Sequence, residues 1–217
     1  ALLKEQQEYL ETGKPVRMDP GFIYGNRETG MYMGEGMEPR DAWTMLCKDG
    51  VPPFADFPVL GDFSTCYGEV LKNKEKLKTK ALNNRTLSYV RLYNTKDMQL
   101  ALMKTGFINV DIAVYKPFYE VGKDGILSST TGSIYGYHAL TCAGWKKIGR
   151  DYYWIIINSW GKEWGKDGIC YMPFGYRGIQ EAWAITDLQR KVIEGNTEAK
   201  IIPPGHFMIP FRGLFEA

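Results

Sequence analysis

The sequence predicts an α+β protein with a helical early half and a late half made of β-strands. Up to about residue 82, apolar side chains recur at helical spacing. From Thr86 onward, β-branched and aromatic residues alternate in short runs separated by turn residues. Because the two kinds of element occupy separate parts of the chain, we expect two subdomains with a cleft between them, where ligands usually bind.

The early half contains three segments with helical spacing. The predicted helices cover residues 1–12, 38–48 and 72–82. Gly13 supplies a stop for the first helix, and Pro39 suits the first turn of the second. Pro20 predicts irregular chain, and the prolines and glycine within residues 51–65 predict an ordered loop.

The late half is predicted to be a series of strands with one short helix among them. The strands are expected at residues 86–93, 107–115, 137–144, 152–158, 168–172 and 181–186. The helix is expected to start with Thr95 as its cap and to end near Gly106.

Composition limits the classes of partner. The chain has 217 residues, of which 44% are hydrophobic and 24% charged, as in soluble globular proteins. Its formal net charge of +2 creates no strong field toward nucleic acid or an anionic membrane. No apolar run approaches the roughly 20 residues of a membrane-spanning helix. We therefore expect no nucleic-acid partner and no membrane span, and the sequence suggests neither a metal nor another cofactor.

One histidine and one asparagine stand out. His138 begins a predicted strand after a loop rich in glycine and threonine, and Asn158 ends another strand before a loop crowded with tryptophan and glycine. An asparagine amide shielded by Trp160 can accept a hydrogen bond from an imidazole and fix its tautomer, which leaves the other ring nitrogen for a nucleophile. These residues would form two-thirds of a catalytic triad.

The segments around both residues, at positions 137–144 and 157–168, resemble the histidine and asparagine motifs of the papain-like cysteine peptidases. The resemblance implies that His138 is the general base, Asn158 orients it and Trp160 shields their hydrogen bond. It covers residues 1–188 and implies a papain-like fold, peptide-bond hydrolysis and a peptide or protein substrate.

The same resemblance implies substrate contacts. Gly36 and Met37 match the edge that pairs with substrate backbone, where glycine allows close approach. Ala113 and Gly136 match positions that line a pocket for a substrate side chain, although both also suit simple sheet packing. Tyr137 stands where the family often has aspartate, beside the histidine.

The family's nucleophilic cysteine and oxyanion-hole glutamine would fall just before Ala1. We therefore expect this chain alone to be inactive, with the missing segment upstream or in a separate chain. Cys142 and Cys170 are expected to be buried core thiols. Cys66 is expected in a loop, and a disulfide between Cys47 and Cys66 stays open. The alternative is an inactive papain-like binding or structural module of a bacterial surface or phage protein, and an extracellular, cell-surface or phage-associated location is favoured.

The composition changes near Leu188. Residues 189–217 resemble the start of the stalk-like module named after the copper amine oxidase N-terminal domain, through the prolines near residue 203 and the segment 208–212. This tail is expected to add nothing to the cleft, with His206 as a loop residue rather than a metal ligand. We thus expect a peptidase domain at 1–188 and a stalk or surface extension at 189–217.

Overall fold

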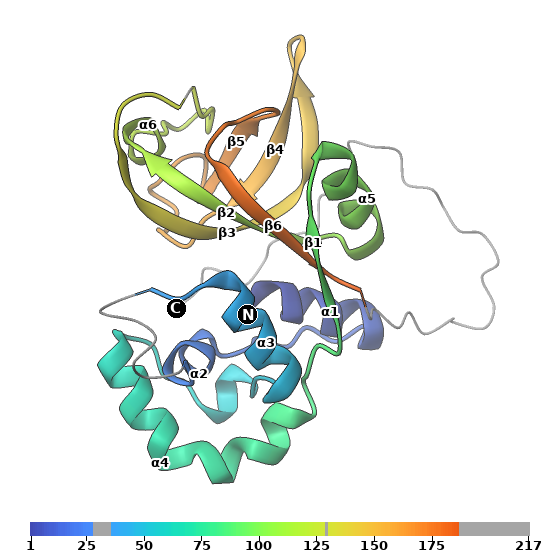
Figure 1. Ribbon diagram of the computed structural model, residues 1–217, viewed down its shortest axis with the longest axis vertical. Coiled ribbons are helices and arrows are strands. Elements are labelled where there is room, and N and C mark those ends of the chain that lie inside the picture. Colours follow the sequence, from blue (N-terminus) through green and yellow to red (C-terminus); the bar gives the residue numbers. More distant parts are fainter. Residues whose placement is uncertain (28–35, 129, 187–217) are drawn as a thin grey trace, which may run out of the picture. The chain divides into compact units, whose positions relative to one another are not determined.

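The computed structural model describes residues 1–27, 36–128 and 130–186. The tail predicted at 189–217, including His206, lies outside these residues. The described chain forms two compact units: unit 1 holds residues 1–90 and 185–186, and unit 2 holds residues 91–184. Helices dominate unit 1 and strands dominate unit 2 (Figure 1), so the predicted α+β class is confirmed.

The described residues of unit 1 form four helices and one 3₁₀ turn. Their bounds are α1 (Leu2–Thr12), α2 (Pro20–Gly25), α3 (Pro39–Lys48), η1 (Phe54–Asp56) and α4 (Phe63–Leu82). The predicted stop of α1 is confirmed, because Gly13 adopts a left-handed φ of 72° and its N–H donates to the carbonyl of Tyr9. The predicted helix at 38–48 is also confirmed as α3.

Two predictions for unit 1 were wrong. Pro20 does not mark irregular chain: it occupies the first turn of α2, where its missing N–H costs nothing, and the carboxylate of Asp19 caps that helix. The loop predicted up to residue 65 ends earlier, since Asp62 caps α4 and helix begins at Phe63. Cys66 is therefore a buried helical residue, not an exposed loop residue.

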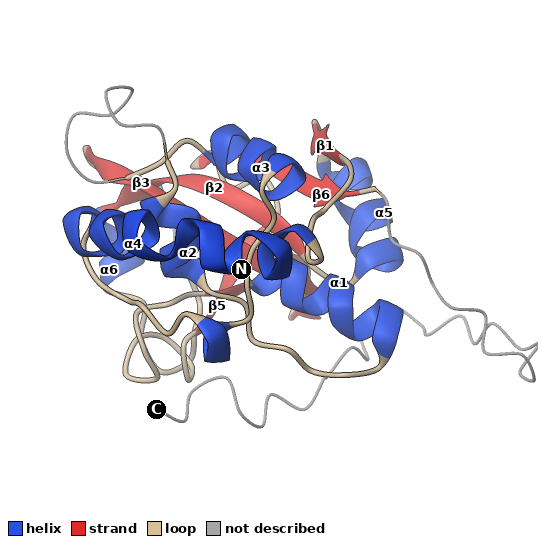
Figure 2. Cartoon of the chain, turned by 90° about the horizontal axis from the view of Figure 1, so that it is seen from below, coloured by secondary structure: helices blue, strands red, loops and turns tan. Residues whose placement is uncertain are grey.

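Helices α2 and α4 lie side by side (Figures 1 and 2). At the contact, a Cβ added to Gly25 would lie 2.4 Å from the carbonyl oxygen of Cys66, so only glycine allows this approach. A small apolar core fills the space between these helices and the neighbouring loop. Its buried members are Phe22, Phe57, Val70, Leu77 and Ala81.

The aspartates that cap α2 and α4 differ in burial. Burial raises the pKa of Asp19, although the backbone N–H groups of Phe22 and Val59 donate to its carboxylate. Asp62 is exposed, and hydrogen bonds from the N–H and side chain of Thr65 lower its pKa. The two carboxylates should therefore affect the pH dependence of stability in opposite ways.

Replacing either capping aspartate by asparagine tests this difference. A carboxyl group whose pKa is raised in the folded state stabilises the fold below about pH 4, and this stabilisation is lost as the pH rises through the folded-state pKa. The unmodified chain should thus lose stability relative to Asp19→Asn as the pH rises from about 4 to 7. A lowered pKa gives a contribution that is lost as the pH falls, so the unmodified chain should lose stability relative to Asp62→Asn below about pH 4.

Urea unfolding of the three proteins across this pH range measures both differences. Asp62→Asn serves as the matched control, because it changes the same residue type at the same position of a helix. Free-energy differences that change with pH in the same direction for both variants would contradict the assignment.

Unit 2 is built around a sheet, with the order β1-β6-β2-β3-β4-β5. Its elements in chain order are β1 (Tyr89–Leu92, which begins in unit 1), α5 (Thr95–Thr105), β2 (Ile108–Tyr115), α6 (Lys116–Tyr119), β3 (Ile134–Ile148), β4 (Asp151–Ile157), β5 (Ile169–Pro173) and β6 (Ile179–Ile185). The predicted strands are all present, although β1 is shorter and β3 much longer than expected. The cap of α5 is Asn94 rather than the predicted Thr95.

The core of unit 2 lies between the sheet and the elements that cover it. The inward residues of β2 are fully buried, as are Trp154 and Ile156 of β4. Met98 and Leu102 of α5 pack against them, as does Phe118 of α6. Burial of this apolar surface holds the sheet in one register, because a slip of one residue would turn each inward side chain outward.

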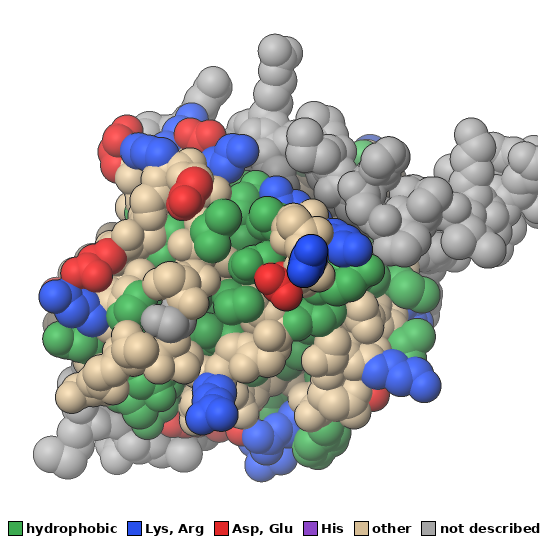
Figure 3. Space-filling model, turned by 90° about the horizontal axis from the view of Figure 1, so that it is seen from above, with side chains coloured by type: hydrophobic (Ala, Val, Ile, Leu, Met, Phe, Trp, Pro, Cys, Tyr) green, Lys and Arg blue, Asp and Glu red, His purple; other side chains and the backbone are tan. Residues whose placement is uncertain are grey.

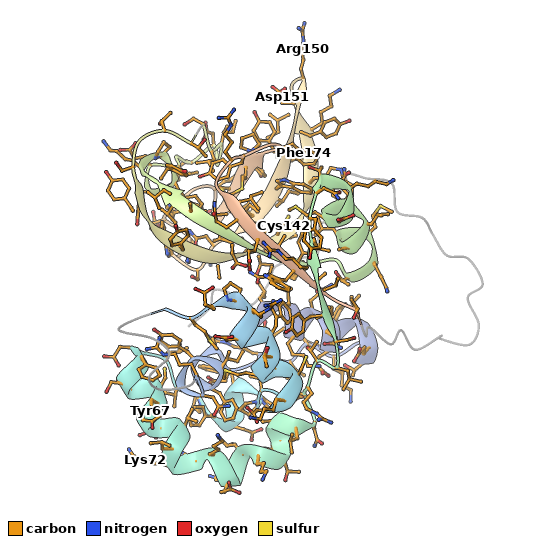
Figure 4. The ribbon with its side chains drawn as sticks, viewed as in Figure 1. Tyr67, Lys72, Cys142, Arg150, Asp151 and Phe174 are labelled. Carbon is orange, nitrogen blue, oxygen red and sulfur yellow. The ribbon has the colours of Figure 1, made fainter. Side chains whose placement is uncertain are left out.

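The pairing of β3 with β4 changes register along its length. Near the turn, Lys147 pairs with Tyr152, and Figure 4 shows Arg150 and Asp151 at the tip of this hairpin. Farther along, Thr141 pairs with Ile157, so the register has moved by one residue at a bulge between Cys142 and Trp145. Gly144 lies in this bulge with a φ of 144°, a value that favours glycine.

The face seen in Figure 3 carries basic and acidic side chains interspersed among apolar ones, without a dominant sign of charge. Within the described ranges, no helix is long and apolar enough to span a bilayer.

Candidate active site

His138 lies on β3, at the point where this strand passes from exposed to buried residues. Tyr135 and Tyr137 before it are exposed, whereas residues 140–142 after it are buried. The imidazole itself is half-buried. Beyond the bulge, Thr141 pairs with Ile157, the residue before Asn158, so the hairpin itself brings the two predicted motifs together.

Asn158 follows the last residue of β4 and is only 2% exposed. Its backbone N–H donates to the carbonyl of Gly168, which anchors the start of the loop. Its side-chain oxygen, Oδ1, lies 2.9 Å from Nε2 of His138. The prediction that the two side chains lie within hydrogen-bond reach is therefore confirmed.

The hydrogen bonds around Asn158 also decide the protonation of the imidazole. Oδ1 accepts a second hydrogen bond, of 2.8 Å, from the backbone N–H of Ser159. Because a backbone N–H can only donate, the shared atom is the amide oxygen, and Nε2 of His138 must carry the proton that it donates. In the neutral ring Nδ1 then holds a lone pair, as a general base requires.

The amide nitrogen of Asn158, Nδ2, is buried and has no hydrogen-bond partner in the described part of the chain. A buried amide donor without an acceptor costs about 1–3 kcal/mol. The site therefore has an unused donor beside the imidazole–amide pair.

Aromatic rings enclose this hydrogen bond. The indole of Trp160 stacks on the imidazole, with ring centroids 5.2 Å apart and planes 19° from parallel. Phe118 lies edge-on to both rings, at 6.3 Å from His138 and 5.3 Å from Trp160. Trp164 packs on Phe118 and donates its Nε1–H to the carbonyl of Phe118. Apolar rings thus lie around a polar pair and limit its contact with water.

Sequence reasoning identified Trp160 but not the other rings. Phe118 and Tyr119 belong to the short helix that follows β2, far from both motifs in the sequence. Trp164 belongs to the asparagine motif, and its short spacing from Trp160 is the sequence signal that could have placed its ring at the site. For Phe118 and Tyr119, which follow the end of a strand, nothing in the sequence indicated which residues their rings would contact.

None of the four cysteines fits the role of nucleophile. All lie in described segments and none forms a disulfide, so the bond considered between Cys47 and Cys66 is absent. Burial raises the pKa of Cys142 to about 12 and also raises that of Cys170. Figure 4 shows Cys142 within the sheet. Such thiols carry almost no thiolate near neutral pH.

The predicted substrate-binding residues fall in both units. Gly36 is exposed in unit 1, where its N–H donates to the hydroxyl of Tyr24 and its carbonyl accepts from Arg27. A substrate strand that pairs with Gly36 would have to replace these bonds. Met37 beside it is half-buried.

The other three predicted contacts belong to the sheet of unit 2. Ala113 has no exposed surface, and its N–H donates to the carbonyl of Gly178, so its geometry favours the alternative of sheet packing. Gly136 has open space where a side chain would stand, and Tyr137 is 74% exposed. The contacts predicted for Gly136 and Tyr137 therefore meet no steric obstacle among the described residues.

Comparison with known proteins gives one family. The family model described as papain family cysteine protease matches residues 28–186. A cathepsin B-like cysteine proteinase of Schistosoma japonicum is 39% identical over 88 residues, which are 41% of this chain and 25% of the relative. Cathepsin B-like cysteine proteinase 3 of Caenorhabditis elegans is 26% identical over 178 residues, covering 81% of this chain and 42% of the relative. The chain thus spans less than half of these relatives.

Solved structures show the same fold. Xylellain, a cysteine protease from Xylella fastidiosa, matches with a TM-score of 0.70 at 22% identity, over 87% of this chain and 78% of that chain. The procathepsin B S9 of Trypanosoma congolense matches with a TM-score of 0.68 at 18% identity, over 87% of this chain and 66% of that one. Since the curated relatives named here come from animals, the bacterial or phage setting expected from the sequence is not favoured.

Proposed function

Because the chain belongs to the papain family of cysteine proteases, we propose that it forms part of a peptidase in which His138 and Asn158 activate a cysteine thiol toward a peptide bond. The observation that carries this proposal is the hydrogen bond of 2.9 Å between Nε2 of His138 and Oδ1 of Asn158. It fixes the tautomer that leaves Nδ1 as a base.

The proposed reaction begins when Nδ1 of His138 takes the proton of a thiol. The thiolate then attacks the carbonyl carbon of the peptide bond, and the imidazolium gives its proton to the leaving amine as that bond breaks. Water then attacks the thioester, with the neutral imidazole again taking a proton, so the thiol and a carboxylic acid are released. Asn158 holds the ring at Nε2 throughout, and Trp160 keeps water from competing for that bond.

We propose that the thiol comes from outside these 217 residues, because the environments of the four cysteines within them do not favour a thiolate. Cys66 is buried in α4, and Cys142 and Cys170 are buried in the sheet with raised pKa values. Cys47 lies near the end of α3, not at a helix N-terminus that would stabilise a thiolate. We propose a segment encoded before Ala1, or a separate chain, as its source.

Peptide hydrolysis by the 217-residue chain, with and without the segment encoded before Ala1, tests the proposal. We expect no turnover by the chain alone, and turnover that iodoacetamide blocks when a cysteine-bearing segment is present. Hydrolysis by the chain alone, blocked by labelling of Cys66, would overturn the assignment of the nucleophile. No hydrolysis in either form would favour the alternative of a peptide-binding module without activity.

The substrate contacts of Gly36, Met37, Gly136 and Tyr137 belong to this proposal, as does the division of the chain near residue 188. A stalk module at 189–217 would link the peptidase domain to an extracellular surface. Its boundary lies outside the described residues and stays a prediction from composition.

A further inference from the structure

We propose that Tyr119 is a positioning residue: it holds the indole of Trp160 against the imidazole of His138 and thereby keeps water away from the His138–Asn158 hydrogen bond. The consequence for rate rests on the proposed peptidase function. The effect on water access rests on the geometry of the rings alone.

Three nearly parallel rings follow one another, Tyr119, Trp160 and the imidazole of His138. Trp160 stacks on His138 on one side, with centroids 5.2 Å apart and an angle of 19°. Tyr119 also stacks on Trp160, with centroids 5.2 Å apart and an angle of 16°. The indole plane thus lies nearly parallel to both neighbouring rings.

Ring contacts hold Trp160, and one of them comes from its own loop, where Trp164 lies edge-on with centroids 5.7 Å apart. It lies in the loop after β4, between Ser159 and Gly161, and Gly161 has a left-handed φ of 90°. Its side chain remains 38% exposed, and no hydrogen bond of its indole is found within the described ranges. Trp164, by contrast, is 9% exposed and is fixed by its bond to the carbonyl of Phe118. Ring contacts therefore account for the position of Trp160.

Tyr119 is itself well placed to act as a support. It follows Phe118, whose buried ring lies edge-on beneath Trp160, so neighbouring residues of α6 contact the indole from two directions. On its other side the ring of Tyr135 lies edge-on, with centroids 6.0 Å apart. Since Tyr135 belongs to β3, three residues before His138, this contact links Tyr119 to the strand that carries the imidazole.

Losing the Tyr119 ring should let the indole move away from His138 more often. A stacked aromatic pair shifts such an equilibrium by about 2- to 12-fold. Each opening exposes Nε2–H of His138 to water, so the exchange rate of that proton should increase by a similar factor. If the protein hydrolyses peptides, kcat should fall in proportion to the closed fraction that is lost, with little change in KM, because Tyr119 acts on the base through Trp160.

Exchange of the Nε2 proton can be measured by NMR after labelling histidine with ¹⁵N, since the sequence contains only two histidines. The His138 signal is assigned by its loss in His138→Gln. We expect about 2- to 12-fold faster exchange in Tyr119→Ala and unchanged exchange in Tyr119→Phe, which keeps the ring. Tyr152→Ala is the matched control, because Tyr152 is 48% exposed, close to the 52% of Tyr119, but packs on Phe174.

Unchanged exchange in Tyr119→Ala would overturn the proposal, and so would equal acceleration in Tyr152→Ala. If Tyr119→Ala does not fold, Tyr119→Leu provides the same comparison, because leucine fills space without a stacking face. This measurement needs no substrate and no nucleophile. Failure of the peptidase assignment would therefore leave the exchange result intact, and normal exchange in Tyr119→Ala would leave that assignment intact.

Discussion

Replacing His138 by alanine in the active protein should lower kcat/KM by about 10²- to 10⁴-fold, the usual contribution of a general base. In the tautomer that Asn158 fixes, Nδ1 of His138 is the atom that accepts the thiol proton. Among the described residues whose rings contact Trp160, His138 alone has a basic side chain. The substitution also removes the imidazolium that stabilises a thiolate. Alkylation of the nucleophile by iodoacetamide near pH 6 should therefore slow together with hydrolysis.

His206→Ala is the control for this experiment, since it removes the other histidine of the sequence, which was predicted to have no catalytic role. Its kcat/KM should equal that of the unmodified protein. Retention of more than about a tenth of the activity in His138→Ala would be incompatible with general-base catalysis by this residue.

Replacing Phe118 by alanine should lower the free energy of unfolding by about 3–5 kcal/mol. Its side chain has no exposed surface and packs on His138, Trp160 and Trp164. Alanine would leave a cavity lined by large rings, which cannot close over it without losing their own contacts. The hydrogen bond from Trp164 to the backbone carbonyl of Phe118 would remain in the variant. The lower free energy of unfolding would therefore measure the lost packing of the ring.

Urea unfolding of Phe118→Ala and Phe118→Leu separates these effects. Leucine keeps most of the volume, and its cost should be clearly smaller than that of alanine. A loss below about 1 kcal/mol for alanine would mean that the neighbouring rings repack and fill the space, contrary to this prediction.

Much of the fold could be predicted from the sequence because local signals agree with the final structure. The strands of unit 2 are runs rich in β-branched and aromatic residues, and glycine or asparagine stands at the turns. Prediction failed at two helix starts where the capping aspartate was not recognised. Asp19 caps the short helix that begins at Pro20, and Asp62 caps α4 at Phe63.

The candidate site, like the fold, could be predicted in part from the sequence. His138, Asn158 and Trp160 belong to motifs whose residue types and order are specific, and the structure brings their side chains together. The rings of Phe118 and Tyr119 could not be predicted, because they come from the segment after β2 and reach the site only through sheet pairing. For Ala113 the sequence left pocket lining and sheet packing open, because burial of a small residue depends on its neighbours, not on its own type.

The bulge at Gly144 shifts the pairing of β3 with β4 by one residue, and this shift decides which residues end the ladder. If the pairing near the turn, Lys147 with Tyr152, continued unchanged along β3, Thr141 would stand opposite Asn158 rather than Ile157. The extra residue of β3 at the bulge thus keeps Asn158 beyond the last pair of this ladder, where its N–H donates to the carbonyl of Gly168. An insertion at the Arg150–Asp151 tip lies outside the paired residues and leaves the pairing of Thr141 unaltered. The hairpin can therefore vary in length at its tip while one extra residue in its middle sets where the ladder ends beside the site.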